Sequence, residues 1–146
     1  MKHPGYLTLI VCLLALSSCN IFKNSHSESK QASVITDRKW QLVELAGKPV
    51  ANQVNGKIPY ILLQQNNGRY VASSGCNGLG GTFTLPGYGR IKFTQGLSTK
   101  MYCENMEIEN GLSKALTIAD NYSLDGNNLS INKARMAPLA RFKAVE

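Results

Sequence analysis

From Trp40 onward, short runs of apolar and β-branched residues alternate with clusters of turn residues. Turn clusters such as Asn66 to Gly68 and Asp125 to Asn128 separate runs that are too short for typical helices. Strands that follow one another through close turns pair with their sequence neighbours. The pattern therefore predicts an antiparallel sheet with strands at 40–45, 59–65, 69–74, 81–85, 90–94, 122–124, 129–131 and 139–145.

One segment has a helical rather than an extended pattern. Ile108, Leu112, Ala115, Leu116 and Ala119 fall on one stripe of a helix, which predicts a helix over 104–119 with acidic residues in its first turns. Gly111 inside it costs about 1 kcal/mol relative to alanine, so the helix must depend on packing against the sheet.

Together these elements predict a mostly β (α+β) fold, a small curved or barrel-like antiparallel sheet with one packed α-helix. The residues expected to form its core are Trp40, Leu42, Ile61, Leu63, Phe83, Phe93, Leu112, Leu116, Tyr122 and Leu129.

The N-terminal segment has the pattern of an export signal. The apolar run at 6–16 follows Lys2 and is shorter than the roughly 20 residues that cross a bilayer. The sequence from Leu16 to Cys19 resembles a bacterial lipobox, which implies removal of residues 1–18 and lipidation of Cys19. The alternative is a spare thiol beside an ordinary cleavage site. Cys12 does not fit the pattern, because bulky Ile10 and Val11 precede it.

The next segment, 19–37, is rich in serine and predicts a flexible tether before a domain at 38–146. His26 lies in this tether, where we interpret it as a solvated side chain. Asn20 rather than aspartate follows Cys19, and by resemblance to Gram-negative sorting rules this implies the outer membrane, with the domain facing the periplasm. The lipid would supply the membrane attachment.

Cys76 and Cys103 remain once Cys12 is cleaved off and Cys19 is lipidated. In an oxidising compartment they can pair only with each other, and a bridge would close a loop of about 28 residues. Two separate buried thiols, or a redox or metal site, are the alternatives. Neither a CxxC spacing nor a histidine in the folded region supports a redox or metal site.

These cysteines belong to a larger pattern that resembles the META domain of HslJ-like heat-shock lipoproteins. The resemblance covers about 38–145. Leu79 departs from it where the family often has an aromatic residue, and Tyr102 departs where it usually has alanine. The residues that carry it are Trp40, Leu42, Gly75, Cys76, Asn77, Gly81, Phe83, Ile91, Phe93, Thr99, Met101, Cys103, Glu109, Tyr122 and Leu129.

The motif residues have structural explanations. Gly75 and Gly78 permit positive φ, and Asn77 can close a turn through neighbouring backbone amides. Thr99, or Ser98 in its place, could cap the start of the helix. Met101 belongs to the same motif. We interpret the carboxylates at the helix start as solvated, and GCNGLGG lacks the Lys-Ser/Thr ending of a phosphate-binding loop.

The composition argues against some classes of function but does not identify the function. With 146 residues the chain has room for one ordinary domain, and its only histidines are His3 and His26, so we expect no catalysis, no cofactor and no metal. We expect a monomeric binding module for an unknown protein or envelope ligand. The resemblance implies a role in envelope stress or maintenance. An inhibitor of a hydrolase such as lysozyme is the alternative, with 75–81 and 96–101 as the loops to inspect.

The net charge of +7 is a weaker indication. Lys133 and Arg135, like Arg141 and Lys143, alternate as they would on one strand face. We favour a solvated sheet face over contact with anionic lipid, and we expect no nucleic-acid binding.

Overall fold

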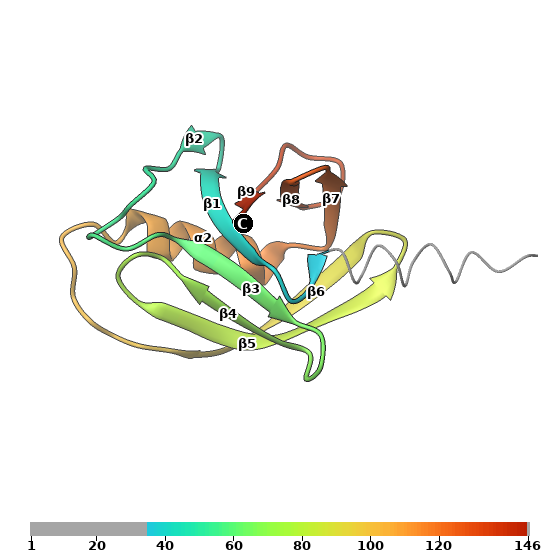
Figure 1. Cartoon of the computed structure of the whole chain (residues 1–146), viewed down its shortest axis with the longest axis horizontal. Coiled ribbons are helices and arrows are strands. Elements are labelled where there is room, and N and C mark those ends of the chain that lie inside the picture. Colours follow the sequence, from blue (N-terminus) through green and yellow to red (C-terminus); the bar gives the residue numbers. More distant parts are fainter. Residues whose placement is uncertain (1–34, 146) are drawn as a thin grey trace, which may run out of the picture.

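The computed structural model of the chain describes residues 35–145. The signal segment, Cys12, Cys19, both histidines and the tether as far as residue 34 lie outside the described residues. One antiparallel sheet and one helix make up the described part (Figure 1). The elements are β1 (Lys39–Leu45), β2 (Lys48–Pro49), β3 (Tyr60–Gln64), β4 (Arg69–Ser73), β5 (Gly78–Gly87), β6 (Arg90–Ser98), α2 (Glu107–Ile118), β7 (Asn121–Asp125), β8 (Asn128–Asn132) and β9 (Ala140–Ala144).

The sheet closes on itself. Strands β3 to β9 pair in sequence order, and β1 pairs with both β3 and β9, so eight strands form a closed antiparallel barrel. Strand β2 is a two-residue addition to the end of β1. The predicted barrel-like sheet with one packed helix is confirmed. Closure removes the free edges that an open sheet would expose.

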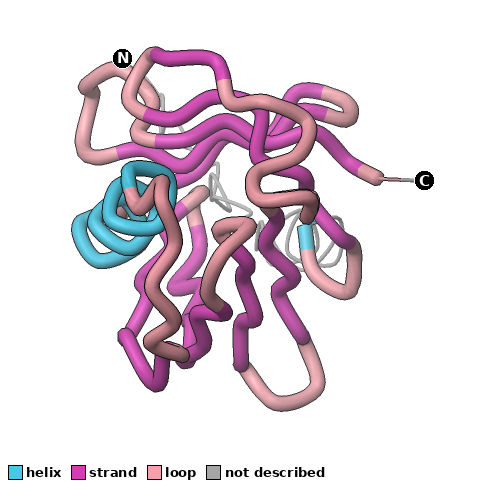
Figure 2. Tube along the Cα trace, turned by 90° about the vertical axis from the view of Figure 1, so that its left-hand side faces the viewer, coloured by secondary structure: helices cyan, strands magenta, loops and turns pink. Residues whose placement is uncertain are grey.

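The barrel is weakest between β6 and β7, where the ladder contains a single register pair, Arg90 with Asn121. Helix α2 lies along this flank and is seen nearly end-on in Figure 2. Leu112, Ala115 and Leu116 of the predicted apolar stripe are buried in α2, Ile108 is partly buried, and Ala119 is buried as the residue that follows the helix. The helix packs against β6, β1 and β8, and so covers the barrel where the strand ladder is interrupted.

The core contains the residues that alternation predicted. Nine of the ten expected core residues are buried, and Phe93 is half-buried and packs its ring edge-to-face with Tyr70 at 5.3 Å between centroids. The folded barrel also includes residues that we predicted to belong to the tether. Ile35 is fully buried, and its carbonyl accepts a 2.9 Å hydrogen bond from the Trp40 indole Nε1. The folded domain therefore begins before residue 38.

The largest differences from the predicted element boundaries concern the helix and the strands β5 and β6. The helix begins at Glu107 rather than at residue 104, after Asn105, whose Oδ1 accepts a 3.0 Å hydrogen bond from the Glu107 N–H. Strands β5 and β6 are longer than expected because the glycine-rich segment pairs as strand. A Cβ at Gly81 would collide with the backbone of β6 and with the Tyr70 ring, so glycine permits this close pairing.

No helix within 35–145 combines the length and the apolar character needed to cross a bilayer.

Candidate functional site

The motif residues singled out in the sequence meet at one place. Residues 74–77 connect β4 to β5, and residues 99–103 follow β6. A disulfide joins Cys76 to Cys103, with their Cα atoms 6.2 Å apart. The bridge fastens the segment after β6 to the β4–β5 connection, and the alternative of two separate thiols is excluded.

The side chain of Asn77 lies at the centre of this arrangement and is almost fully buried. Its Nδ2 donates to the Met101 carbonyl at 2.9 Å and to Glu109 Oε2 at 2.7 Å. Its Oδ1 accepts from Thr99 Oγ1 and from the Met101 N–H, both at 2.8 Å. The amide thus uses both donors and two acceptor sites, as a buried polar group must if it is not to cost stability. We call Asn77, Thr99, Met101, Glu109 and Ser74 the Asn77 centre.

Ser74 was missed by the sequence analysis. Its buried hydroxyl accepts hydrogen bonds from the N–H groups of Cys76 at 3.3 Å and Asn77 at 3.2 Å. These two hydrogen bonds stabilise the tight turn that we predicted the Asn77 side chain would close. A serine directly before a glycine, after a strand, is a signal for such a turn.

Glu109 differs from its interpretation as a solvated carboxylate. It is half-buried, and α2 carries it over the barrel end so that Oε2 receives the Asn77 amide. The charge assists this hydrogen bond. The helix, the β4–β5 connection and the segment after β6 therefore share one polar contact.

Two local predictions are corrected. Gly75 has φ +94°, as expected, and a Cβ there would meet Val54, but Gly78 is extended in β5. Thr99 does not cap the helix, which begins at Glu107; its Oγ1 instead accepts the Gly78 N–H at 3.1 Å and donates to Asn77. Ser98 ends β6 and does not cap the helix either.

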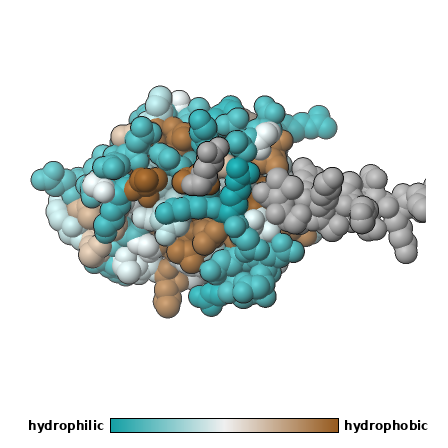
Figure 3. Space-filling model, viewed as in Figure 1, coloured by the Kyte–Doolittle hydropathy of each residue, from teal (hydrophilic) through white to brown (hydrophobic). Residues whose placement is uncertain are grey.

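The two loops marked for inspection have opposite environments. In 75–81, Cys76, Asn77 and Leu79 are buried. The second segment, 96–101, contains the end of β6 and the residues that follow it. We extend it by one residue to Tyr102 and call it the stapled loop; in it Leu97 is 91% and Tyr102 92% exposed, and Met101 is half exposed. The two family departures thus separate: Leu79 packs in the core and Tyr102 faces solvent. Figure 3 shows apolar patches among polar side chains on the face of the molecule viewed in Figure 1.

The META domain family model matches residues 33–146. The chain belongs to the META domain family. Among curated proteins none matches it. A solved structure of a protein from Burkholderia xenovorans is similar, with 21% identity and a TM-score of 0.61, over 80% of this chain and 87% of that one. A DUF4847 family protein from Bacteroides vulgatus is also similar, with 16% identity and a TM-score of 0.54, over 78% of this chain and 95% of that one. These likenesses concern the fold.

The META domain also has a cavity of about 320 Å³ beside the start of α2. Its lining is mainly apolar and includes Leu45, Val50 and Ile108. Lys48 and Glu107, also among its lining residues, form a 3.2 Å ion pair. Both charged side chains are largely exposed, so the pair adds little stability. The mainly apolar lining means that this cavity could accept an apolar group.

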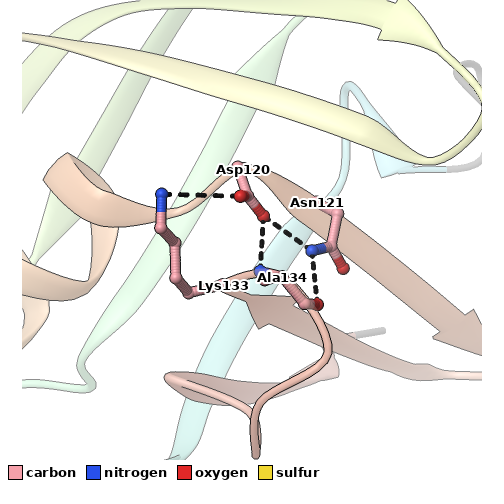
Figure 4. Close-up of polar contacts among 4 residues, drawn as sticks. All are labelled: Asp120, Asn121, Lys133 and Ala134. Carbon is pink, nitrogen blue, oxygen red and sulfur yellow. Dashed lines mark hydrogen bonds and ion pairs between the residues drawn. The ribbon is translucent and has the colours of Figure 1, made fainter.

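A polar cluster at the junction of α2 and β7 is structural (Figure 4). Asp120 accepts hydrogen bonds from the Ala134 N–H at 2.8 Å and from Asn121 Nδ2 at 2.7 Å, and it lies 3.4 Å from Lys133 Nζ. The bond from Ala134, followed by that from Asn121 and the charge of Lys133, lowers the pKa of Asp120. The cluster fastens the loop after β8 to the end of the helix.

The basic residues do not form the two strand pairs that alternation suggested. Lys133 and Arg135 lie in the loop between β8 and β9, and only Arg141 and Lys143 share the outer face of a strand. Arg141 forms a 3.1 Å ion pair with Glu44. Within 35–145, no three histidine, cysteine or acidic side chains are grouped as a metal site would require.

Proposed function

We propose that this META domain protein works without catalysis, as an outer-membrane lipoprotein anchored through Cys19, with its domain facing the periplasm. In this proposal the stapled loop binds a protein partner, and the binding serves envelope maintenance or the response to envelope stress. The lipobox-like sequence supports the anchor, and the likeness to HslJ-type lipoproteins supports the role.

The observation that carries the proposal is the contrast between the two sides of the stapled loop. Underneath, Met101 is held by Asn77 through both its N–H and its carbonyl, and the disulfide follows two residues later. Above, Leu97 and Tyr102 are almost fully exposed. Exposed apolar side chains on a rigid support lose little conformational entropy on binding, and tyrosine is enriched among residues that dominate binding energy.

The polar groups of the Asn77 centre are engaged in holding the loop. Glu109 receives the Asn77 amide, and the Thr99 hydroxyl donates to the same side chain. A general acid or base must instead reach a proton on the substrate. This use of the motif residues favours a scaffold for binding over an active site.

Lys100 supports inhibition of a hydrolase such as lysozyme as a second candidate. It lies in the stapled loop between Leu97 and Tyr102 and is exposed. Glycoside hydrolases use a pair of carboxylates flanking the scissile bond. A lysine flanked by apolar side chains is complementary to such a cleft.

Site-specific photocrosslinking in intact cells tests the loop. A photoreactive residue at position 97 or 102 should give one discrete protein adduct, and one at exposed Lys57, outside the loop, should give none. Leu97→Asp should remove the adduct formed at position 102. Equal adducts at all three sites, or none at any, would contradict binding through the loop.

The identity of the adduct separates the two candidates. A hydrolase whose activity the purified protein lowers, with Lys100→Glu abolishing the effect, would establish inhibition. Intact mass tests the anchor: the mature protein should begin at Cys19 and carry acyl chains. A chain that retains Met1 without acyl mass would refute the location.

A further inference from the structure

One end of the barrel carries both the start of the described chain and three hairpin turns. We call it the Ile35 end; it comprises Ile35 to Lys39 and the turns at 65–68, 87–90 and 125–128. Asp37 Oδ1 accepts the Gln65 N–H at 3.0 Å, and Arg38 Nη2 donates to Asn127 Oδ1 at 3.0 Å, so two of the turns are bonded to the chain start. In Figure 1 the β3–β4 and β5–β6 turns point to the same side as the start of β1.

Among the described residues, the charges at this end are mostly positive and form no ion pair with a carboxylate. The acidic side chains that the described part of the chain contributes to it are Asp37 and Asp125. All three ion pairs found within 35–145 use other cations, namely Lys48, Lys133 and Arg141. The basic side chains of the Ile35 end are Arg38, Lys39 and Arg90. Arg69 at the start of β4 and Lys143 of β9, which pairs with Asn128, lie next to it.

An aromatic side chain accompanies these cations. Tyr88, at the tip of the β5–β6 hairpin, is 87% exposed, and Arg90 follows it two residues later. Lys39 lies over the Tyr60 ring, with Nζ 4.0 Å from the ring centroid. Tyrosine at the headgroup level and lysine or arginine near anionic lipid are the usual residues of a membrane interface.

We propose that the Ile35 end docks on an anionic phospholipid surface. The inference rests on the proposed anchor at Cys19, which precedes Ile35 by 16 residues. A random coil of that length would span roughly 20 to 25 Å, and an anchor at that distance would hold this end close to the bilayer. At such a high effective concentration, a few cations suffice for contact.

Docking also orients the rest of the molecule. Strand β4 begins at Arg69, next to the Ile35 end, and ends at Ser73, beside the Asn77 centre. The stapled loop therefore lies toward the opposite end of the barrel. With the Ile35 end on the bilayer, Leu97 and Tyr102 face away from the membrane.

Two tryptophan reporters test the orientation in the full acylated protein. Tyr88→Trp reports the Ile35 end and Tyr102→Trp the stapled loop, while the fully buried Trp40 gives the background. The vesicles contain brominated phosphatidylcholine, with or without phosphatidylglycerol. Position 88 should be quenched only with phosphatidylglycerol present, and position 102 should not be quenched. Equal quenching at both positions, or none at 88, would overturn the proposal.

Two matched triple variants distinguish the effect of where the cations lie from the effect of the total charge. Lys39→Gln with Arg69→Gln and Lys143→Gln should abolish quenching at position 88 and weaken vesicle affinity by at least about tenfold. Lys57→Gln with Lys114→Gln and Arg135→Gln removes the same charge from exposed positions elsewhere and should leave the quenching unchanged. Equal losses in both variants would contradict docking through the Ile35 end.

Acyl mass is measured on the same preparation. If it is absent, the proposed anchor fails, whereas docking is still tested by sedimentation of the chain with the two kinds of vesicle. An acylated protein without quenching at position 88 refutes docking alone.

Discussion

Asn77 shows why one buried side chain can fix a loop that has little core of its own. Four of its side-chain hydrogen bonds reach Thr99, Met101 and Glu109, which lie on two segments far along the chain. An aspartate has the same shape but offers no N–H donor, and it would place a second carboxylate beside Glu109. Only asparagine satisfies both sides of this centre.

Asn77→Ala should therefore destabilise the oxidised protein by about 3 kcal/mol, because several buried partners lose their hydrogen bonds at once. Asn66→Ala, in the exposed β3–β4 turn, is the control and should change the free energy of unfolding by less than about 0.5 kcal/mol. Urea unfolding of both variants measures the difference. Equal stability of the two variants would mean that the Asn77 centre is not a structural centre.

At the scale of elements, α2 packs against the barrel at Gly111, a residue type that disfavours helix formation. Gly111 lies over Leu45 of β1, and a Cβ added there would approach the Leu45 side chain within 2.6 Å. The glycine lets the helix sit close to the barrel. The contact also explains why a poor helix former occupies the middle of the helix.

Gly111→Ala should lower stability by about 1 kcal/mol, because overpacking outweighs the propensity gained. In a Leu45→Ala background the same change should become neutral or stabilising, since the opposing side chain is gone. A double-mutant cycle by urea unfolding measures this coupling. Additive effects of the two substitutions would contradict the contact.

The disulfide acts on the same part of the molecule. Replacing Cys76 and Cys103 together by serine should cost about 3 to 4 kcal/mol in the chain-entropy model, because the bridge closes a loop of about 28 residues. Dithiothreitol should lower the stability of the wild-type protein by a similar amount and leave the double variant unchanged. Alkylation followed by mass spectrometry should find both thiols blocked in the unreduced protein. Free thiols there would refute the bridge.

At the scale of the whole molecule, the features that could be predicted from the sequence are those that local patterns determine. Strand positions and the core follow from alternation, and the helix stripe follows from its spacing. Closure of the barrel depends on β1 pairing with β9, whose residues are about 100 positions apart, and no local pattern specifies that register. The Asn77 centre was predicted only in part, because the contact of Glu109 with Asn77 requires the packing of α2 on the barrel. The hydrogen bond from the Asn77 N–H to Ser74 is local, and a turn signal in the sequence could have indicated it.

Burial of Tyr70 inside the barrel makes the stability of the whole fold sensitive to high pH. The side chain is almost fully buried beside Phe93, and this burial raises the pKa of its phenol above the ordinary 10.0. The folded state then holds the phenol proton more tightly than the unfolded state does. Stability from this difference is complete below pH 10 and is lost as the pH rises toward the folded pKa.

Urea unfolding between about pH 8 and about pH 11 should therefore show a falling free energy of unfolding. Tyr70→Phe should flatten that fall, because phenylalanine keeps the ring packing without an ionisable group. Tyr102→Phe, at an exposed tyrosine, should retain the wild-type slope, and an equal slope in the Tyr70 variant would show that another group controls the alkaline transition.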